Sequence, residues 1–176
     1  MKIYAISGLG ADQRVFEHLN LDVELIALDW ITPHKNESIK VYAKRLSEVI
    51  ETDDEFCLIG VSFGGLIATE IGKILSPIKI VLISSVQTKY ELRSIYKWVG
   101  NSKIIKLIPT ALFNPPKIIA KYLMGAHNSK LFYEILYDTD VSFVKWALQE
   151  FTAWQNTITS TKVLKINGTK DKLIPP

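Results

Sequence analysis

The chain has little of what a secreted or membrane protein needs. Its one cysteine, Cys57, cannot form an internal disulfide, which excludes a small scaffold held together by disulfide bonds. No hydrophobic run approaches the length of a membrane-spanning helix, and the apolar start at residues 1–6 is too short for the apolar region of a signal peptide. We therefore expect a cytoplasmic protein with Cys57 in its core.

Two kinds of ligand-binding pattern are also absent from the sequence. It has no cluster of histidine, cysteine and carboxylate residues at metal-ligand spacing and no nucleotide-binding glycine fingerprint, so we expect no metal and no organic cofactor. The net charge is only +3, but it is uneven, because residues 88–130 carry eight basic side chains against one acidic. No recognition motif accompanies this charge, so we expect no nucleic-acid partner.

The most informative motif is Gly60-Val61-Ser62-Phe63-Gly64. It lies between an apolar run at 56–60 and an apolar helical pattern that Ser76-Pro77 ends. A serine hydroxyl is a weak nucleophile unless it is held out beside a base and a pair of oxyanion donors, and a sharp turn from strand to helix holds it in this way. Side chains two positions before and after the serine would collide across the bend, and glycine stands at both. The motif therefore predicts a nucleophilic Ser62.

The hydrophobic pattern alternates along the chain. Apolar runs at 2–6, 23–28, 56–60, 79–84 and 162–166 predict strands, and amphipathic patterns at 12–19, 38–51, 63–75 and 141–155 predict helices. Such alternation favours right-handed crossovers and an α/β fold with a mostly parallel sheet covered on both faces. We expect the last helix to pack Val144, Ala147, Leu148 and Phe151 on the core, with Trp154 as a further candidate for this face. The predicted domains are a core of 1–87 and 141–176 and a helical cap of 88–140, inserted after the fourth strand.

These residues resemble the α/β-hydrolase fold family over nearly the whole chain. The matching pieces are 7–12 after the first strand, 60–65 at the serine and 168–171 after the last strand. The resemblance implies a three-layer α-β-α sandwich with Ser62 as nucleophile, Asp171 as the acid, and the backbone N–H groups of Leu9 and Phe63 as the oxyanion hole. It implies a serine esterase, carboxylesterase-like, acting on a small-molecule ester or acyl substrate. Thioester, amide and acyl-transfer chemistry would use the same residues.

The catalytic histidine of the family follows the acid, and this sequence stops five residues after Asp171. We therefore expect a chain that lacks the C-terminal segment carrying this histidine, with impaired activity. Its last strand would then be an exposed sheet edge through which copies could associate. The three histidines present are His18, His34 and His127, of which His127 is the best substitute because it lies in the insert.

The cap residues leave two questions open. Trp98, Phe113 and Tyr122 are candidates for lining a substrate pocket, although aromatic residues at such spacing more often hold a helical cap together. The basic side chains, with Lys117 and Lys121 one turn apart, suggest a weak contact with an anionic interface. The alternative to an enzyme is a non-catalytic member of the same fold that binds a small ligand.

Overall fold

The structure is a computed structural model of the chain, and it describes residues 1–17, 19, 21–102, 104–113, 134–135, 137–171 and 173–174. The strands are β1 Lys2–Ile6, β2 Leu25–Leu28, β3 Phe56–Val61, β4 Lys79–Ile83 and β5 Val163–Ile166. The α-helices are α1 Ile39–Leu46, α2 Phe63–Leu75, α3 Ser94–Ser102, α4 Ile104–Leu107 and α7 Val141–Ala153. Short 3₁₀ helices are η1 Gln13–Phe16, η2 Ser47–Val49, η3 Lys89–Glu91 and η4 Thr110–Phe113.

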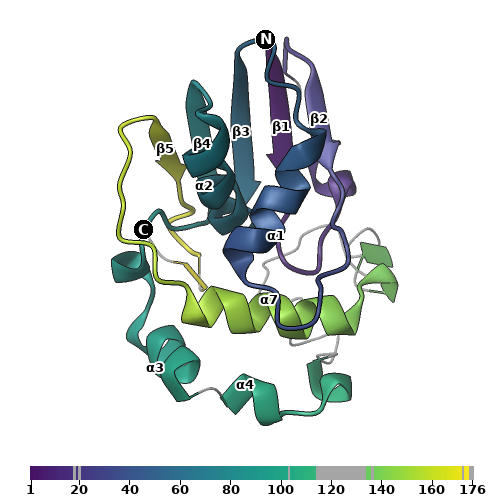
Figure 1. Ribbon diagram of the computed structural model, residues 1–176, viewed down its shortest axis with the longest axis vertical. Helices are drawn as coiled ribbons and strands as arrows, with labels where there is room; N and C mark the ends of the chain where they lie inside the picture. The colour runs from purple at the N-terminus through teal and green to yellow at the C-terminus, as the bar shows by residue number, and fades with distance from the viewer. Residues whose placement is uncertain are drawn as a thin grey trace.

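The described strands form one sheet in the order β2-β1-β3-β4-β5, and every neighbouring pair is parallel. All strands therefore end at the same edge, which is the lower edge of the sheet in Figure 1. In the register, Val61 of β3 lies opposite Ile83 of β4, and Ile83 lies opposite Ile166 of β5. The α/β fold class with a parallel sheet and helices between the strands is confirmed. The division into a core and a cap stays a prediction.

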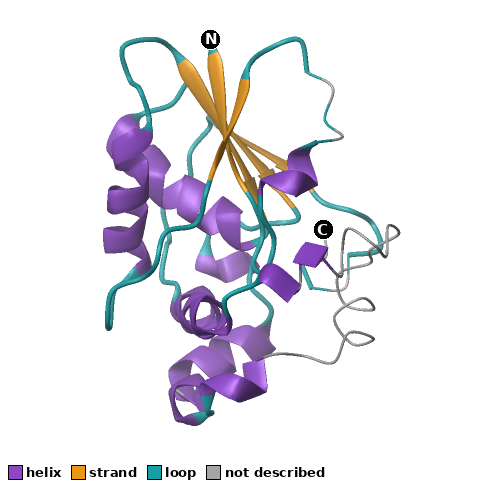
Figure 2. Cartoon of the chain, turned by 90° about the vertical axis from the view of Figure 1, so that its right-hand side faces the viewer, coloured by secondary structure: helices purple, strands orange, loops and turns teal. Residues whose placement is uncertain are grey.

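One face of the sheet carries most of the core. α1 and α2 cover this face, α7 lies across the carboxyl edge below it (Figures 1 and 2), and the strands turn large side chains toward the helices. The strands, α1 and α2 all contribute large side chains that are at most 2% exposed. They include Tyr4, Ile6, Tyr42, Leu58, Phe63, Leu66, Ile67, Ile71 and Leu82. Continuous apolar strands of this kind are typical of parallel sheets, because such sheets are covered on both faces.

The other face has a thinner layer. Among the described residues, its cover includes η1, whose Phe16 packs on Ala5 and Ile59. Towards the β5 edge, Leu164 and Ile166 are about half exposed. Within the described part of the chain, no helix is both long and apolar enough to cross a membrane.

Two sequence expectations need correction. The helix expected at 12–19 is the four-residue η1, because the Asp12 carboxylate accepts from the Arg14 N–H and starts a turn that does not continue as an α-helix. The face expected for the last helix is also wrong in part. The buried side chains of α7 include Phe143 and Trp146 as well as Ala147, because α7 packs between α2 on one side and α3 on another, so more than one of its sides is covered.

Glu37 joins three segments that surround the carboxyl edge. Its side chain is 2% exposed, accepts from the His34 N–H at 2.7 Å and forms an ion pair with Arg45 of α1 at 2.7 Å. Its backbone carbonyl accepts from the Trp146 indole of α7 at 2.8 Å. Burial alone would raise the pKa of Glu37, but these hydrogen bonds and the Arg45 charge outweigh burial and lower it.

We predict that Glu37→Gln destabilises the fold at pH 7 by about 3 kcal/mol, since it leaves the partly buried Arg45 without its counter-charge. Because the folded pKa is lowered, the carboxylate stabilises the fold above its ordinary pKa and loses this effect as pH falls. The difference between wild type and variant should therefore shrink below about pH 4. Thermal unfolding at several pH values measures it. Glu48→Gln, at an exposed glutamate of η2, is the matched control, and an equal loss in both variants would contradict the prediction.

Candidate active site

Ser62 lies between β3 and α2 in a backbone conformation that is rare for a residue with a side chain. Its φ is 52° and its ψ −118°, and it forms the N-cap position of α2. Positive φ costs free energy for such a residue and persists only where the surroundings hold it. Two hydrogen bonds hold the Ser62 carbonyl, from the Gly65 N–H at 2.9 Å and the buried Ser85 hydroxyl at 2.7 Å. The expected strand-to-helix turn is therefore present, and Ser62 remains partly exposed.

The glycines around Ser62 are required by close backbone contact. A Cβ on Gly60 would lie 2.5 Å from the carbonyl oxygen of Gly64, and one on Gly64 would lie 2.2 Å from that of Ser7. A Cβ on Gly65 would lie 2.2 Å from the Ser85 hydroxyl oxygen. The turn, the end of β1 and the residues after β4 thus meet without room for side chains.

The loop after β1 is a tight turn beside Ser62. The Ala11 N–H donates to the Gly8 carbonyl at 3.1 Å, and Gly10 has φ +70°, which is the pattern of a type II turn with glycine at its third position. A Cβ on Gly8 would lie 3.5 Å from the Cβ of Ser62. Because the peptide plane holds the Gly8 carbonyl and the Leu9 N–H on opposite sides, this turn directs the Leu9 N–H away from its own interior.

The backbone N–H groups of Leu9 and Phe63, near Ser62, find no acceptor among the described residues. The first N–H groups of a helix have no partner within the helix, and Phe63 is the first residue of α2. Such N–H groups can stabilise a developing negative charge, and the positive end of the helix dipole acts in the same direction. Both residues that the resemblance assigns to the oxyanion hole therefore carry available donors.

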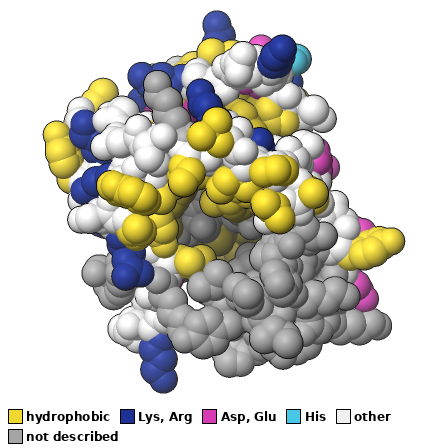
Figure 3. All heavy atoms as spheres, turned by 90° about the horizontal axis from the view of Figure 1, so that it is seen from below, with side chains coloured by type: hydrophobic (Ala, Val, Ile, Leu, Met, Phe, Trp, Pro, Cys, Tyr) yellow, Lys and Arg dark blue, Asp and Glu magenta, His cyan; other side chains and the backbone are white. Residues whose placement is uncertain are grey.

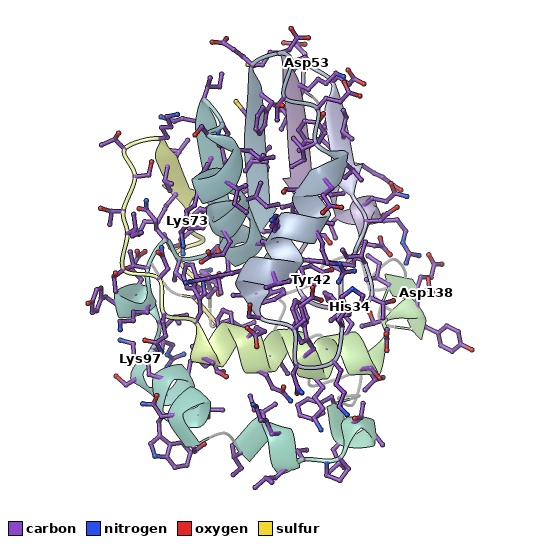
Figure 4. All side chains as sticks on the ribbon, in the orientation of Figure 1. His34, Tyr42, Asp53, Lys73, Lys97 and Asp138 are labelled. Carbon is purple, nitrogen blue, oxygen red and sulfur yellow. The ribbon has the colours of Figure 1, made fainter. Side chains whose placement is uncertain are left out.

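The loop after β1 is also fastened to its neighbours. The Ala11 carbonyl accepts from the Ser7 hydroxyl at 2.8 Å and from the Trp30 indole at 2.9 Å. The Gly10 carbonyl accepts from the Thr139 hydroxyl at 3.3 Å. Arg14 pairs with Asp12 and, at 2.9 Å, with Asp138. The segment before α7, where Figure 4 shows Asp138, is therefore tied to this loop.

The side chain of Phe63 anchors the turn from below. It is 1% exposed and lies in a cluster with Trp30, Tyr42, Phe143 and Trp146, whose closest rings, Tyr42 and Trp146, are 4.4 Å apart between centroids. Each such pair stabilises the fold by about 0.5–1.5 kcal/mol beyond its buried area. Burial also raises the pKa of Tyr42, whose hydroxyl donates to the Ile31 carbonyl. The sequence did not indicate Trp30 and Phe143 as members of this cluster. The only signal for each is its aromatic side chain, which follows a strand for Trp30 and lies on a helix for Phe143.

Asp171 lies after β5 at the same edge of the sheet as Ser62. Its Oδ1 accepts from the N–H groups of Leu173 and Ile174, each at 2.9 Å. Leu173 in turn accepts from the Tyr96 hydroxyl of α3 at 3.0 Å. Burial raises the pKa of Tyr96, and the nearby Asp171 charge adds to this effect. β3 and β5, after which Ser62 and Asp171 follow, are two strand spacings apart in the sheet, about 10 Å.

Solved structures with this arrangement of elements identify the fold. No known protein family and no curated protein matches the sequence. A thermophilic esterase from Thermogutta terrifontis is 15% identical with a TM-score of 0.74, over 100% of this chain and 74% of its own. RedJ thioesterase from Streptomyces coelicolor is 16% identical with a TM-score of 0.66, over 99% and 69%. An alpha/beta hydrolase from a Medee basin deep-sea metagenome library is 15% identical with a TM-score of 0.65, over 99% and 74%. The chain has the α/β-hydrolase fold.

In an α/β-hydrolase fold the base would lie beside the serine, and the structure describes one of the candidates. His34 is exposed on the loop before α1, where Figure 4 labels it. His18 and His127 lie outside the described residues. We therefore assign none of the described residues as the general base that would accept the proton of Ser62.

The pocket candidates in the insert have different surroundings. Trp98 does not line an enclosed pocket, because it is 62% exposed while Tyr96 and Gly100 of the same helix face α7. Phe113 of η4 is partly buried beneath the ammonium group of Lys145 of α7, 5.9 Å from the ring centroid. Tyr122 lies outside the described residues. Phe113 and Tyr122 as pocket residues stay predictions.

We predict that Gly64→Ala destabilises the protein by more than about 3 kcal/mol, because the added Cβ meets the backbone oxygens of Ser7 and Ile6, which cannot rotate away. Gly168→Ala is the matched control, since a Cβ there meets nothing within 4 Å. It should change stability by less than about 0.5 kcal/mol. Denaturant unfolding of both variants measures the effect, and a near-native Gly64→Ala protein would show that the elbow is packed differently.

Proposed function

We propose that the chain is a serine hydrolase that cleaves carboxylic esters through an acyl-enzyme on Ser62. The observation that carries the proposal is the positive φ of Ser62 at the start of α2, next to two backbone N–H groups without described acceptors. A residue held in a strained conformation by three tightly packed glycines is characteristic of a functional position. An esterase and a thioesterase among the structures that share the fold add support for acyl chemistry.

The proposed reaction uses the backbone and one side chain. The Ser62 hydroxyl oxygen attacks the ester carbonyl carbon, and the carbonyl oxygen takes the electron pair. The N–H groups of Phe63 and Leu9 donate to this oxygen, and one such donor typically changes the rate by about a hundred- to a thousandfold. Collapse of the intermediate releases the alcohol, which receives the proton lost by Ser62. Water then attacks the acyl-enzyme, the acid leaves, and the proton returns to Ser62.

A base must accept the Ser62 proton, and a histidine oriented by Asp171 is the arrangement that the site supports best. Removing the histidine of such a triad costs about a millionfold in turnover. The candidates within the chain are His18, His34 and His127. Individual alanine variants of the three identify the base, since the one that serves should abolish the reaction while the other two leave it unchanged.

We predict that a fluorophosphonate labels the folded chain at Ser62 and that Ser62→Ala abolishes the labelling, because only an activated serine reacts quickly with this probe. Intact-mass spectrometry measures the adduct. Ser142→Ala, at an exposed serine of α7, is the matched control and should label as the wild type does. Labelling that survives in Ser62→Ala would contradict the proposal, and its absence from folded wild-type protein would show that the 176 residues lack a base for Ser62. Ester, thioester and amide substrates then define the acyl chemistry.

A second prediction concerns Ser85, whose hydroxyl donates to the Ser62 carbonyl from a site that is 1% exposed. Ser85→Ala removes one of the two hydrogen bonds that hold this carbonyl. We expect labelling of Ser62 to slow by a factor of about five, the rate equivalent of about 1 kcal/mol for one hydrogen bond. Ser94→Ala, at an exposed serine of α3, should label at the wild-type rate. An unchanged rate in Ser85→Ala would show that the Gly65 N–H holds the turn by itself.

A further inference from the structure

α3 has two apolar sides, and only one of them is covered. On one side, the Tyr96 ring meets Phe151 of α7 at 5.3 Å between centroids. Gly100 approaches α7 so closely that a Cβ would lie 2.0 Å from the Thr152 carbonyl oxygen. On the other side, Ile95 is 53% exposed and Trp98 62% exposed. Residues three apart on a helix are neighbours on its surface, so these two side chains form one exposed apolar stripe.

The exposed stripe continues through the next two short helices. In α4, Ile104 is 42% and Leu107 83% exposed, and in η4 Leu112 is 71% exposed. We call these five side chains the α3–α4–η4 face. Figure 3 shows hydrophobic side chains gathered across this lower surface of the molecule. Contiguous exposed apolar surface of this kind marks an interaction site, whereas single exposed apolar residues do not.

The surroundings of the α3–α4–η4 face are positively charged. Residues 88–102 and 104–113 carry four basic side chains, Lys89, Arg93, Lys97 and Lys106, against one acidic side chain, Glu91. Glu91 is itself paired with Lys165 of β5. Among the described residues, no carboxylate pairs with Lys97 or Lys106. In Figure 3 the Lys and Arg side chains lie mainly around the left and upper parts of the face, and the Asp and Glu side chains at its right margin.

The exposed apolar side chains and the positive charge around them together indicate which kind of partner the face binds. A second copy of the chain would bring the same positive charge to a face-to-face contact and be repelled. An anionic lipid surface offers both complements, since its acyl region takes apolar side chains and its headgroups attract lysines. Tryptophan favours the boundary between these regions, and a lysine can extend its ammonium group to the headgroups while its alkyl chain stays in apolar surroundings.

We propose that the α3–α4–η4 face binds the surface of a membrane that contains anionic lipids. Trp98 and Leu107 enter the boundary between headgroups and acyl chains, and Lys97 and Lys106 contact the headgroups. Figure 1 places α3 and α4 on the same side of the molecule as the carboxyl ends of the strands, so this contact brings the edge that holds Ser62 toward the lipid. Binding of the face does not depend on the proposed reaction of Ser62.

The test is co-sedimentation of the full chain with vesicles of phosphatidylcholine alone and of phosphatidylcholine mixed with phosphatidylserine. We expect binding to the mixed vesicles, weakened at least about tenfold by Lys97→Glu with Lys106→Glu and by Trp98→Ser with Leu107→Ser. The matched controls are Lys40→Glu with Lys44→Glu and Val41→Ser with Val49→Ser, at exposed positions of α1 and η2. Both should bind as the wild type does, and circular dichroism checks that every variant is folded.

Tryptophan emission gives an independent readout. Trp98 is exposed, whereas Trp146 and Trp154 are buried and Trp30 is partly buried, so a blue shift on mixed vesicles reports on Trp98. Trp98→Phe should lose this shift and still bind. The proposal is overturned if phosphatidylserine does not strengthen binding, if the control pairs weaken it equally, or if the emission does not move. It is also overturned if the chain instead self-associates in sedimentation and Trp98→Ser with Leu107→Ser abolishes this, because a second copy then occupies the face.

Discussion

The left-handed backbone of Ser62 is the constraint on which the site depends. To leave β3 and enter α2 within one residue, the chain brings the start of α2 against the end of β1 and the residues after β4, and each contact excludes a Cβ. The Ser85 hydroxyl and the Phe63 ring then hold the turn from two sides. The strain at Ser62 is thus balanced by contacts from every neighbouring segment, so the position of its hydroxyl is a property of the whole core.

The loop after β1 is fastened to the segment that precedes α7. It shares the Ala11 carbonyl between two donors, receives Thr139 on Gly10 and reaches Asp138 through Arg14. The same loop offers the Leu9 N–H beside Ser62. The segment before α7 therefore contacts the loop whose backbone would hold an oxyanion. A displacement of this segment would move that loop.

Short-range rules explain which features the sequence predicts well. The strands and the turn at Ser62 follow from continuous apolar runs and from glycine at positions 60 and 64, which are local signals. The buried face of α7 and the exposure of Trp98 do not follow, because both depend on which side of α3 meets α7, a contact between residues about 50 apart. The partners of Asp171 are local, since they are the N–H groups two and three residues on. The base cannot be read from composition, since it is defined by position in space alone.

The long connection between β4 and β5 affects the order in which the segments around Ser62 and Asp171 fold and unfold. β1 to β4, with the Ser62 turn, are complete within the first 83 residues, whereas β5 joins the sheet only after residues 84–162. In the described part of the chain β5 pairs on one side only, through β4, and edge segments of this kind open at lower free energy than the centre of a sheet. Asp171 is therefore made well after the Ser62 turn, and we expect β5 to open on heating before the central strands β1, β3 and β4. The proposed reaction would then fail before most of the secondary structure is lost, so an activity measurement would register damage that circular dichroism does not see.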